Sequence, residues 1–506
     1  MNSMPAGEER GIGAETRPNI VVILSDDQGP WALGCAGNSE IRTPNLDRLA
    51  AEGTRFDRFF CASPVCSPAR ATLLTGQIPS QHGVHDWIDG GNMQTATLDP
   101  IKYLAGKTSY TQVLAANGYT CGLSGKWHLG DSIVPQHGFS HWYVHQRGGG
   151  PYYNAPMIRN GELIDQPGYL TDCITDDALE FIDEQQKRDD PFYLSVHYTA
   201  PHSPWVDSHP QEIVDSYDAC PFDSIPRDPM HPWALPGWVP TPESTEWRED
   251  LKGYFAAVTA MDANVGRILD KLDALGLREN TLIWFLGDNG FNCGHHGLWG
   301  KGNASFPFNM YDESVLVPAI VCHPGRIPSG IVRSEMVSGY DFALTLLEYA
   351  GFRHPDANVL PGQSFRYLLD PDARIDTNPR DHVVIYDEYG PVRMIRTDAW
   401  KYVHRYPYGP HELYDLVSDP GERNNRIEDA AYLAVVERLR NRLERWYLDY
   451  ADPAVDGVRE PVTGTGQIER SGPANGGRLA FLQGQRLDKE AEQRSLPRTP
   501  DPGTST

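Results

Sequence analysis

Short apolar runs alternate with amphipathic stretches along most of the chain. The run NIVVILSD at 19–26 is apolar almost throughout and rich in β-branched residues, as a strand buried on both faces of a sheet should be. The same reasoning predicts later strands at YTCGLSGK (119–126), PFYLSVHY (191–198), TLIWFLGD (281–288) and VPAIVCH (317–323).

Helices are predicted between these strands. TPNLDRLAAEG (43–53) carries the clearest signals, because Thr43 can cap the helix, Pro44 suits its first turn and Gly53 stops it. Strands and helices that take turns in this way indicate an α/β fold with a mainly parallel central sheet flanked by helices. The other predicted helices lie near 108–116, near 174–187, across 248–275 and at 340–351.

The pattern changes twice further along the chain. Residues 199–246 are dense in Pro and Trp, which suits an ordered surface excursion. From about 381 the runs look like antiparallel strands, and a helix at 429–447 follows, so a smaller C-terminal α+β domain is predicted. The expected division is a flexible N-terminal extension (1–17), a large α/β domain (18–380), a C-terminal sheet and helix subdomain (381–450) and a mobile polar tail (451–506).

Composition excludes some classes of partner. The 506 residues are 40% hydrophobic, enough for a substantial core, and their formal net charge is −24. Such acidity argues against broad nucleic-acid binding and against anchoring to an anionic membrane, although a few local basic groups could still bind a small anion. No apolar run is long enough to cross a bilayer.

The N-terminus and the cysteines bear on the compartment. The first twenty residues have neither the basic nor the apolar part of a secretory signal, and the eight cysteines are dispersed without a Cys-x-x-Cys pair. We therefore expect a cytoplasmic protein with reduced thiols, with no membrane or nucleic-acid partner, and a processed exported form stays open as the alternative. A homo-oligomer stays open.

Chemically reactive residues follow four of the predicted strands. Because parallel strands end at one edge of a sheet, where ligands bind, these residues should meet there. Each alone could be a turn or a solvated loop residue, but four such strand ends together indicate a site. They are Asp26 and Asp27, then Lys126 and His128, then His197 and His202, and last Asp288 and Asn289, with Lys301 shortly beyond.

These residues fall into two chemical groups. The hard oxygen ligands that Ca²⁺ or Mg²⁺ prefers come from Asp26, Asp27, Asp288 and Asn289. Cations or N–H donors suited to a tetrahedral oxyanion come from Arg70, Lys126, His128, His202 and Lys301. A divalent cation beside such donors suggests phosphoryl or sulfuryl transfer.

A cysteine between two prolines, in SPVCSPARATLLTG (63–76), carries a family resemblance. Residues Cys66 to Arg70 match the Cys-x-Pro-x-Arg signature, and the chain resembles the type I, formylglycine-dependent sulfatases of the alkaline phosphatase superfamily. Six further motifs stand on either side of it in the family's order, so the resemblance covers roughly residues 18–450. They are SDDQG, TPNLDRLAAEGTRF, GKWHLG, APHSP, GDNG and KGN. It implies a sulfatase-like catalytic α/β domain, and a C-terminal four-stranded antiparallel sheet with a helix.

The resemblance implies a modified nucleophile. A separate maturase would oxidise Cys66 to Cα-formylglycine, whose hydrate attacks sulfur with one hydroxyl and uses the other to expel sulfate. From the residues alone, a plain buried thiol and a thiolate nucleophile at a helix amino terminus stay open.

The resemblance also implies roles for the other residues. Asp26, Asp27, Asp288, Asn289 and the modified Cys66 would hold Ca²⁺, with Mg²⁺ as the alternative. Arg70 would polarise the nucleophile, and Lys126 and Lys301 would grip sulfate oxygens. His128 would act as base when sulfate leaves, His202 would help protonate the leaving alcohol, and Asp288 is the candidate base for the attacking hydroxyl. For His197 the expected role is packing or support of the site residues from behind.

Three functions compete. The leading one is hydrolysis of an aryl or carbohydrate sulfate monoester, on a small molecule or a saccharide. The alternative is a phosphonate monoester or phosphodiester hydrolase that uses the same site. A non-catalytic anion-binding protein is disfavoured because every expected polar position is filled. Specificity is expected from loops at 82–95, 145–155, 199–246 and 291–311.

Overall fold

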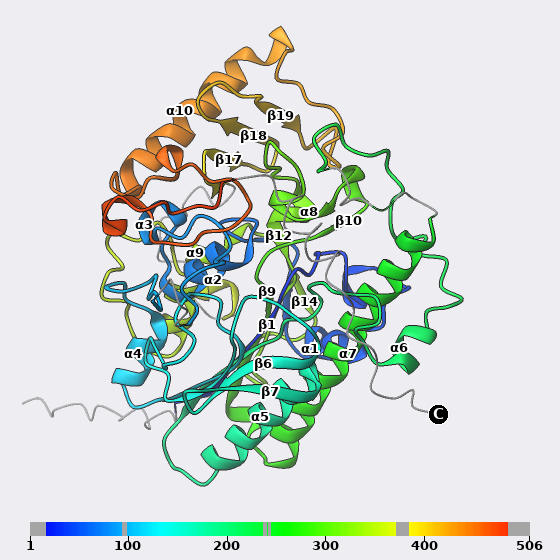
Figure 1. The fold of residues 1–506 in the computed structure, drawn as a ribbon, viewed down its shortest axis with the longest axis vertical. Coiled ribbons are helices and arrows are strands. Elements are labelled where there is room, and N and C mark those ends of the chain that lie inside the picture. The colour runs from blue at the N-terminus through cyan, green and yellow to red at the C-terminus, as the bar shows by residue number, and fades with distance from the viewer. Residues whose placement is uncertain (1–16, 94–98, 236–239, 241–243, 371–383, 484–506) are drawn as a thin grey trace, which may run out of the picture.

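The computed structural model describes residues 17–93, 99–235, 240, 244–370 and 384–483. Its largest element is a ten-stranded mixed sheet, whose central strands are parallel (Figure 1). In spatial order the strands are β14 (Ile331–Arg333), β2 (Thr54–Phe56), β13 (Ala319–Cys322), β9 (Thr281–Gly287), β1 (Asn19–Ser25), β8 (Phe192–His197), β4 (Thr120–Lys126), β5 (His141–His145), β6 (Tyr153–Arg159) and β7 (Glu162–Tyr169).

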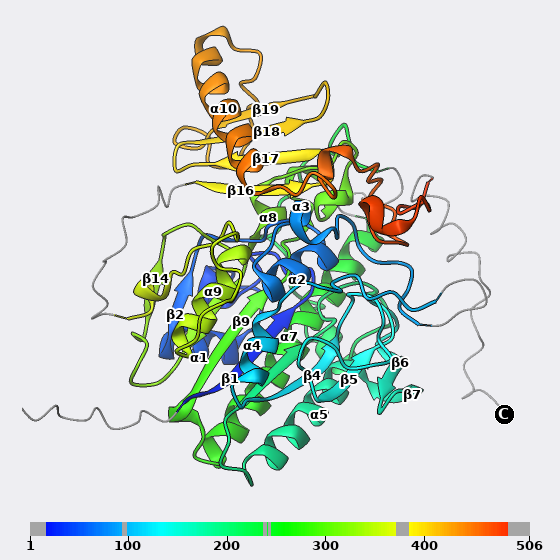
Figure 2. The ribbon, with the colours of Figure 1, turned by 90° about the vertical axis from the view of Figure 1, so that its left-hand side faces the viewer.

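Helices cover both faces of this sheet (Figure 2). On one face, Ile20, Val22 and Leu24 of β1 share a core with α2 (Cys66–Thr75), α4 (Tyr110–Ala116) and α9 (Gly339–Tyr349). On the other face, Val21 and Ile23 share a core with α1 (Pro44–Glu52), α5 (Leu170–Gln185) and α7 (Thr245–Ala274). All seven residues of β1 are buried, as its apolar pattern predicted. The predicted α/β class is confirmed.

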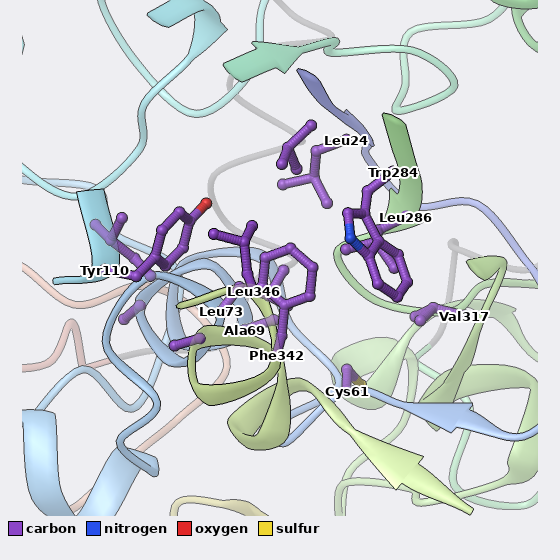
Figure 3. Packing of buried hydrophobic residues seen from close by; sticks show 14 of the residues in the cluster. Leu24, Cys61, Ala69, Leu73, Tyr110, Trp284, Leu286, Val317, Phe342 and Leu346 are labelled. Atoms are coloured by element: carbon purple, nitrogen blue, oxygen red, sulfur yellow. The ribbon is translucent and has the colours of Figure 1, made fainter. Parts of the chain in front are cut away.

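Helix α2 lies inside the first of these cores (Figure 3). Its residues Ala69 and Leu73 share one cluster with Phe342 and Leu346 of α9, and Trp284 of β9 packs edge-on against Phe342 with ring centroids 5.4 Å apart. Every residue of α2 is buried. Dense packing on all sides holds the amino-terminal end of the helix in one place relative to the sheet.

The C-terminal subdomain has the expected antiparallel sheet and helix. Strands β16 (Ile385–Tyr389), β17 (Val392–Arg396), β18 (Trp400–Arg405) and β19 (Glu412–Asp415) form the sheet, and α10 (Leu433–Tyr450) packs on it through Leu439, Leu443 and Tyr447. The predicted boundary at 380/381 falls within 371–383, and the predicted extension, apart from Arg17, falls within 1–16. Both segments lie outside the described residues.

Shorter elements complete the described chain. They are β3 (Phe59–Phe60), β12 (Leu316–Val317) and β15 (Val337–Ser338) in one small sheet, β10 (Asn292–Cys293) and β11 (Trp299–Gly300) in another, and the helices α3 (Pro79–His82), α6 (Gln211–Asp215) and α8 (Asp312–Val315). None of the helices in the described ranges is long and apolar enough to span a bilayer.

The segment after α10 corrects one expectation. A mobile polar tail was predicted from 451 onward, but residues 451–483 pack beside α3 as the red segment in Figure 1. Phe481 and Gln467 are fully buried, and Gln467 forms a β-bridge with Ile88. Hydrogen bonds to the segment 83–89 hold a stretch that has few apolar residues of its own. Residues 484–506 lie outside the described residues.

Candidate active site

The four strand ends meet as predicted. Strands β9, β1, β8 and β4 are neighbours in the sheet and run parallel, so their carboxyl ends lie side by side. The backbone ties these ends together, because Asp288 N donates to Ser25 O (3.1 Å) and Asp26 N donates to Ala200 O (3.0 Å). Three elements thus present their polar residues to one place.

Two of the site residues have left-handed backbones. Asp27 has φ 60° and His128 has φ 54°, values that non-glycine residues adopt at a cost of about 1–3 kcal/mol. At Asp27 the turn lets its own N–H donate to Asp288 Oδ1 (3.2 Å). Tyr254 of α7 supports the same turn, since its hydroxyl donates to Asp27 O (2.9 Å) and accepts from Gly29 N (3.1 Å).

Cys66 reaches this cluster from the first turn of α2. Its Sγ accepts from Lys301 Nζ at 2.7 Å, and Lys301 also pairs with Asp27. One turn further along α2, Arg70 Nε donates to Asp288 Oδ2 (2.9 Å) and Nη1 donates to Lys126 O (3.2 Å). The thiol, the carboxylates and three basic side chains therefore form one connected network.

The oxygen ligands fit a divalent cation. One ligand atom each from Asp26, Cys66 and Asp288 lies within 4.8 Å of the others. Asp26 Oδ1 and Asn289 Oδ1 are buried and have no hydrogen-bond partner among the described residues. Asn289 Nδ2 donates to Asp27 Oδ1 (2.9 Å), so Asp27 joins the same group. Buried polar atoms are normally satisfied, and two unsatisfied oxygens beside carboxylates match the ligand chemistry of Ca²⁺ or Mg²⁺.

Burial and nearby charges set the pKa values of the acidic groups. Burial, with smaller effects from Asp288 and Asp27, raises the pKa of Asp26 to about 7 even though Lys126 pairs with it. For Asp27, burial opposes ionisation, but Lys301 and His202 hold its pKa well below the usual range. Burial raises the pKa of the Cys66 thiol to about 12, against the effect of Lys126 and Lys301. An unmodified Cys66 would therefore be a protonated, weakly nucleophilic thiol at neutral pH.

Burial disfavours the protonated form of the histidines of the site. Burial, together with Lys126 and Arg70, holds the pKa of His128 well below 6.5, and its Nε2 lies 2.9 Å from Ile88 O. Burial lowers the pKa of His202 to about 4, although Asp27 Oδ2 lies 3.6 Å from its Nε2. The His202 side chain is 27% exposed, so part of it reaches solvent. His197 Nδ1 lies 3.1 Å from Lys126 O, beneath the network.

The structure thus brings together the ten residues that the sequence predicted for catalysis or metal binding, and adds neighbours that sequence reasoning missed. The glycines of loop 148–150 lie against three histidines: a Cβ on Gly148 would come 2.0 Å from the His128 ring, and a Cβ on Gly149 or Gly150 would come 3.3 Å or 3.1 Å from His202 or His145. The run of three glycines in QRGGGP was the signal of this close approach.

Comparison with known proteins decides the family. A family model described as sulfatase matches residues 18–352, and a model described as the C-terminal region of N-sulphoglucosamine sulphohydrolase matches residues 294–448. The chain belongs to the sulfatase family. Its expected place among the formylglycine-dependent sulfatases of the alkaline phosphatase superfamily is confirmed, and the protein is a sulfatase-type enzyme.

The relatives of this sulfatase act on sulfate esters. It is 29% identical to an N-acetylglucosamine-6-O-sulfatase of Bacteroides thetaiotaomicron, over 86% of this chain and 87% of that one. It is 31% identical to an ulvan-active sulfatase of Formosa agariphila, over 85% of this chain and 80% of that one. These relatives support sulfate ester hydrolysis as the general activity.

Solved structures of other proteins share the fold of this sulfatase. A protein in complex with its substrate D-glucosamine-2-N,6-O-disulfate superposes on this sulfatase with a TM-score of 0.71 at 27% identity, covering 87% of this chain and 99% of that one. A phosphonate monoester hydrolase of Agrobacterium radiobacter shares the fold, with a TM-score of 0.62 at 22% identity over 85% of this chain and 96% of that one.

Proposed function

We propose that this sulfatase hydrolyses a sulfate monoester of a saccharide, with a formylglycine made from Cys66 as nucleophile and a divalent cation beside it. The observation that carries the proposal is the position of Cys66 Sγ, 2.7 Å from Lys301 Nζ and within 4.8 Å of carboxylate oxygens of Asp26 and Asp288. A saccharide substrate is supported by the relatives named for N-acetylglucosamine-6-sulfate and ulvan, and by the neighbour bound to a disulfated glucosamine.

The raised pKa of the Cys66 thiol supports modification over a thiolate mechanism. A hydrated aldehyde at the same position offers two hydroxyls, one to attack sulfur and one to release sulfate afterwards. Arg70, whose Nη2 is buried without a hydrogen-bond partner in the described ranges, has a donor left for that side chain.

A divalent cation would be held by oxygens of Asp26, Asp27, Asp288 and Asn289, with Ca²⁺ favoured and Mg²⁺ as the alternative. When bound, it would withdraw charge from the sulfate and orient the attacking oxygen. Lys126 and Lys301 now pair with Asp26 and Asp27, and we expect both ammonium groups to contact sulfate oxygens when substrate binds.

Two neutral histidines complete the proposed chemistry. His128 Nδ1 is buried and has no partner within the described chain, so it can accept a proton when sulfate is released. His202 is partly exposed and its Nδ1 lies 2.8 Å from Ser203 O, so its unprotonated Nε2 can take a proton from the Lys301 ammonium and pass it to the leaving alcohol. Asp288 is the candidate base for the attacking hydroxyl.

Hydrolysis of a phosphonate monoester is the second candidate, because the Agrobacterium radiobacter enzyme shares the fold. The test is production with a formylglycine-generating maturase, mass analysis of the peptide that contains residue 66, and turnover of matched aryl sulfate and phosphonate ester substrates. We expect formylglycine and a preference for the sulfate.

Two outcomes would contradict this proposal. Full activity with an unmodified Cys66 thiol would exclude the formylglycine mechanism. A strong preference for the phosphonate ester would reverse the assignment of the reaction. The variant Cys66→Ala, which cannot be modified, is the matched blank for both measurements.

A further inference from the structure

A cavity of about 470 Å³ lies between residues 89–93, residues 146–147 and the segment 468–479. Its polar lining comes from three distant parts of the chain: Asp89, Asn92, Gln146, Arg147, Glu469 and Arg478. This volume lies within the range of small-ligand sites, and side chains with several donors and acceptors are suited to sugar hydroxyls.

Two residues of the cavity lining are next in sequence to residues that contact His128. Asp89 directly follows Ile88, whose carbonyl oxygen lies 2.9 Å from His128 Nε2. Arg147 directly precedes Gly148, whose backbone touches the His128 ring. A molecule whose sulfate group lies among the site residues would therefore extend its organic part into this cavity.

The wall opposite the loops is built by the C-terminal segment. Asp89 N donates to Gln467 O (2.9 Å), and Gln467 is fully buried, so the wall that carries Glu469 and Arg478 is fixed against the wall that carries Asp89. A cavity formed before ligand binding loses little entropy when it is filled.

One charge in the lining is uncompensated. Glu469 Oε2 pairs with Arg478 (Nη2 at 2.6 Å), and its Oε1 accepts from Arg470 N (2.9 Å). Asp89 also has an interaction partner. The guanidinium of Arg147 makes no hydrogen bond or ion pair with any residue that the structure describes, and the residue is exposed. A free guanidinium matches a carboxylate or sulfate with two parallel hydrogen bonds.

We infer that this cavity binds the saccharide part of the substrate, and that Arg147 recognises a second anionic group on that saccharide. The inference rests on the proposed sulfatase function and assigns its substrate class, a sugar sulfate that carries another sulfate or a carboxylate. Arg147 then determines specificity and takes no part in the chemical step.

The test uses the full-length matured enzyme and the variant Arg147→Gln. The substrates are a neutral aryl sulfate, N-acetylglucosamine 6-sulfate, glucosamine-2-N,6-O-disulfate and a sulfated disaccharide that contains a uronate. For whichever doubly anionic sugar the enzyme prefers, we expect KM to rise about 10- to 100-fold with kcat nearly unchanged. The aryl sulfate and the singly sulfated sugar should keep their wild-type constants.

Two further variants sharpen the result. Arg147→Lys keeps the charge without the planar fork, and should recover part of the lost affinity. Arg188→Gln, at an exposed position beyond α5, removes the same charge away from the cavity and should change nothing. If KM rises only for glucosamine-2-N,6-O-disulfate, Arg147 binds the second sulfate. If KM rises only for the disaccharide that contains a uronate, Arg147 binds the carboxylate.

The inference is overturned if Arg147→Gln changes KM equally for all four substrates, or for none. If the enzyme still hydrolyses the aryl sulfate in that case, the proposed sulfatase function stands and only the role given to the cavity and Arg147 is wrong. If the matured enzyme hydrolyses no sulfate ester, the proposed function and this inference fail together.

Discussion

Gly148 lies so close to His128 that no other residue fits there. A Cβ at this position would come 2.0 Å from both Cε1 and Nε2 of the imidazole. Any shift of the ring would disturb the contact of its Nε2 with Ile88 O (2.9 Å) in a buried site. A glycine at residue 148 is therefore what allows the imidazole of His128, a proposed catalytic residue, to occupy its position.

We predict that Gly148→Ala lowers kcat by about 100-fold or more, because a shift of about 1 Å at a reacting group has that effect. The measurement is turnover of an aryl sulfate, with circular dichroism to verify the fold. Gly421→Ala is the control, since its new Cβ meets nothing closer than 3.8 Å. Wild-type turnover in Gly148→Ala would show that His128 is not used.

The charge of Asp288 has a separate consequence at the residue scale. Its Oδ1 accepts from the N–H groups of Asp27 (3.2 Å) and Asn289 (2.7 Å). Asparagine keeps that acceptor and the shape of the side chain but removes the negative charge. We predict that Asp288→Asn is less stable than wild type, because the buried Arg70 Nε loses its acceptor Oδ2, and that it loses at least about 100-fold in turnover and no longer responds to calcium.

Thermal unfolding measures the calcium response independently of activity. A cation that binds only the folded wild-type protein adds about 2.7 kcal/mol of stability at 100 times its Kd, so the melting temperature should rise. Asp288→Asn should show no such rise at the same concentration. Asp270→Asn, with a side chain that is 75% exposed, should respond as wild type does. A calcium-insensitive wild-type protein would remove the metal from the proposal.

At the scale of elements, Gln467 makes several of the hydrogen bonds that hold the segment 451–483. Gln467 Oε1 accepts from His85 N (2.9 Å), and Nε2 donates to Gly83 O and Glu469 O (3.0 Å each). Shortening the Gln467 side chain to that of alanine would leave these buried backbone groups without hydrogen-bond partners.

We predict that Gln467→Ala lowers the free energy of unfolding by about 2–4 kcal/mol, since each unsatisfied buried group costs about 1–3 kcal/mol. Urea denaturation gives the value. Gln211→Ala removes only an exposed hydrogen bond to Asp215 and should stay within about 0.5 kcal/mol of wild type. Similar values for both variants would mean that the segment contributes little.

The elements differ in how far their sequence predicts them. Strand β1 and helix α1 follow their apolar patterns to within one residue, because each buries a regular face. The meeting of Asp26, Lys126, His202 and Asp288 was also predictable, since parallel order alone brings strand ends together. The bridge between Gln467 and Ile88 was not, because polar contacts between residues so distant along the chain leave no periodic signal.

At the scale of the whole molecule, buried charges join the two domains. Lys401 of β18 is fully buried, donates to Met310 O (2.9 Å), and pairs with Asp312 of α8 and with Glu422. Removing one partner of such a pair leaves an unpaired buried charge, which costs about 3–5 kcal/mol. The C-terminal subdomain therefore depends on the α/β domain for its stability.

Buried histidines make the whole molecule sensitive to acid, and His323 isolates one contribution. Its Nδ1 lies 2.7 Å from the Tyr349 hydroxyl and its Nε2 lies 3.1 Å from Glu279 O, an arrangement that suits the neutral ring. Burial, followed by Arg326, lowers its pKa to about 4. The unfolded chain, with a histidine pKa of about 6.5, binds this proton first as the pH falls. The stability that the neutral ring contributes is therefore complete above pH 6.5 and is lost as the pH falls toward 4.

Between pH 7 and pH 5 the free energy of unfolding of the wild-type protein should therefore fall by about 2 kcal/mol more than that of His323→Gln. Urea denaturation of both proteins at the two pH values measures this difference, and parallel losses would show that His323 is protonated without cost in the folded state.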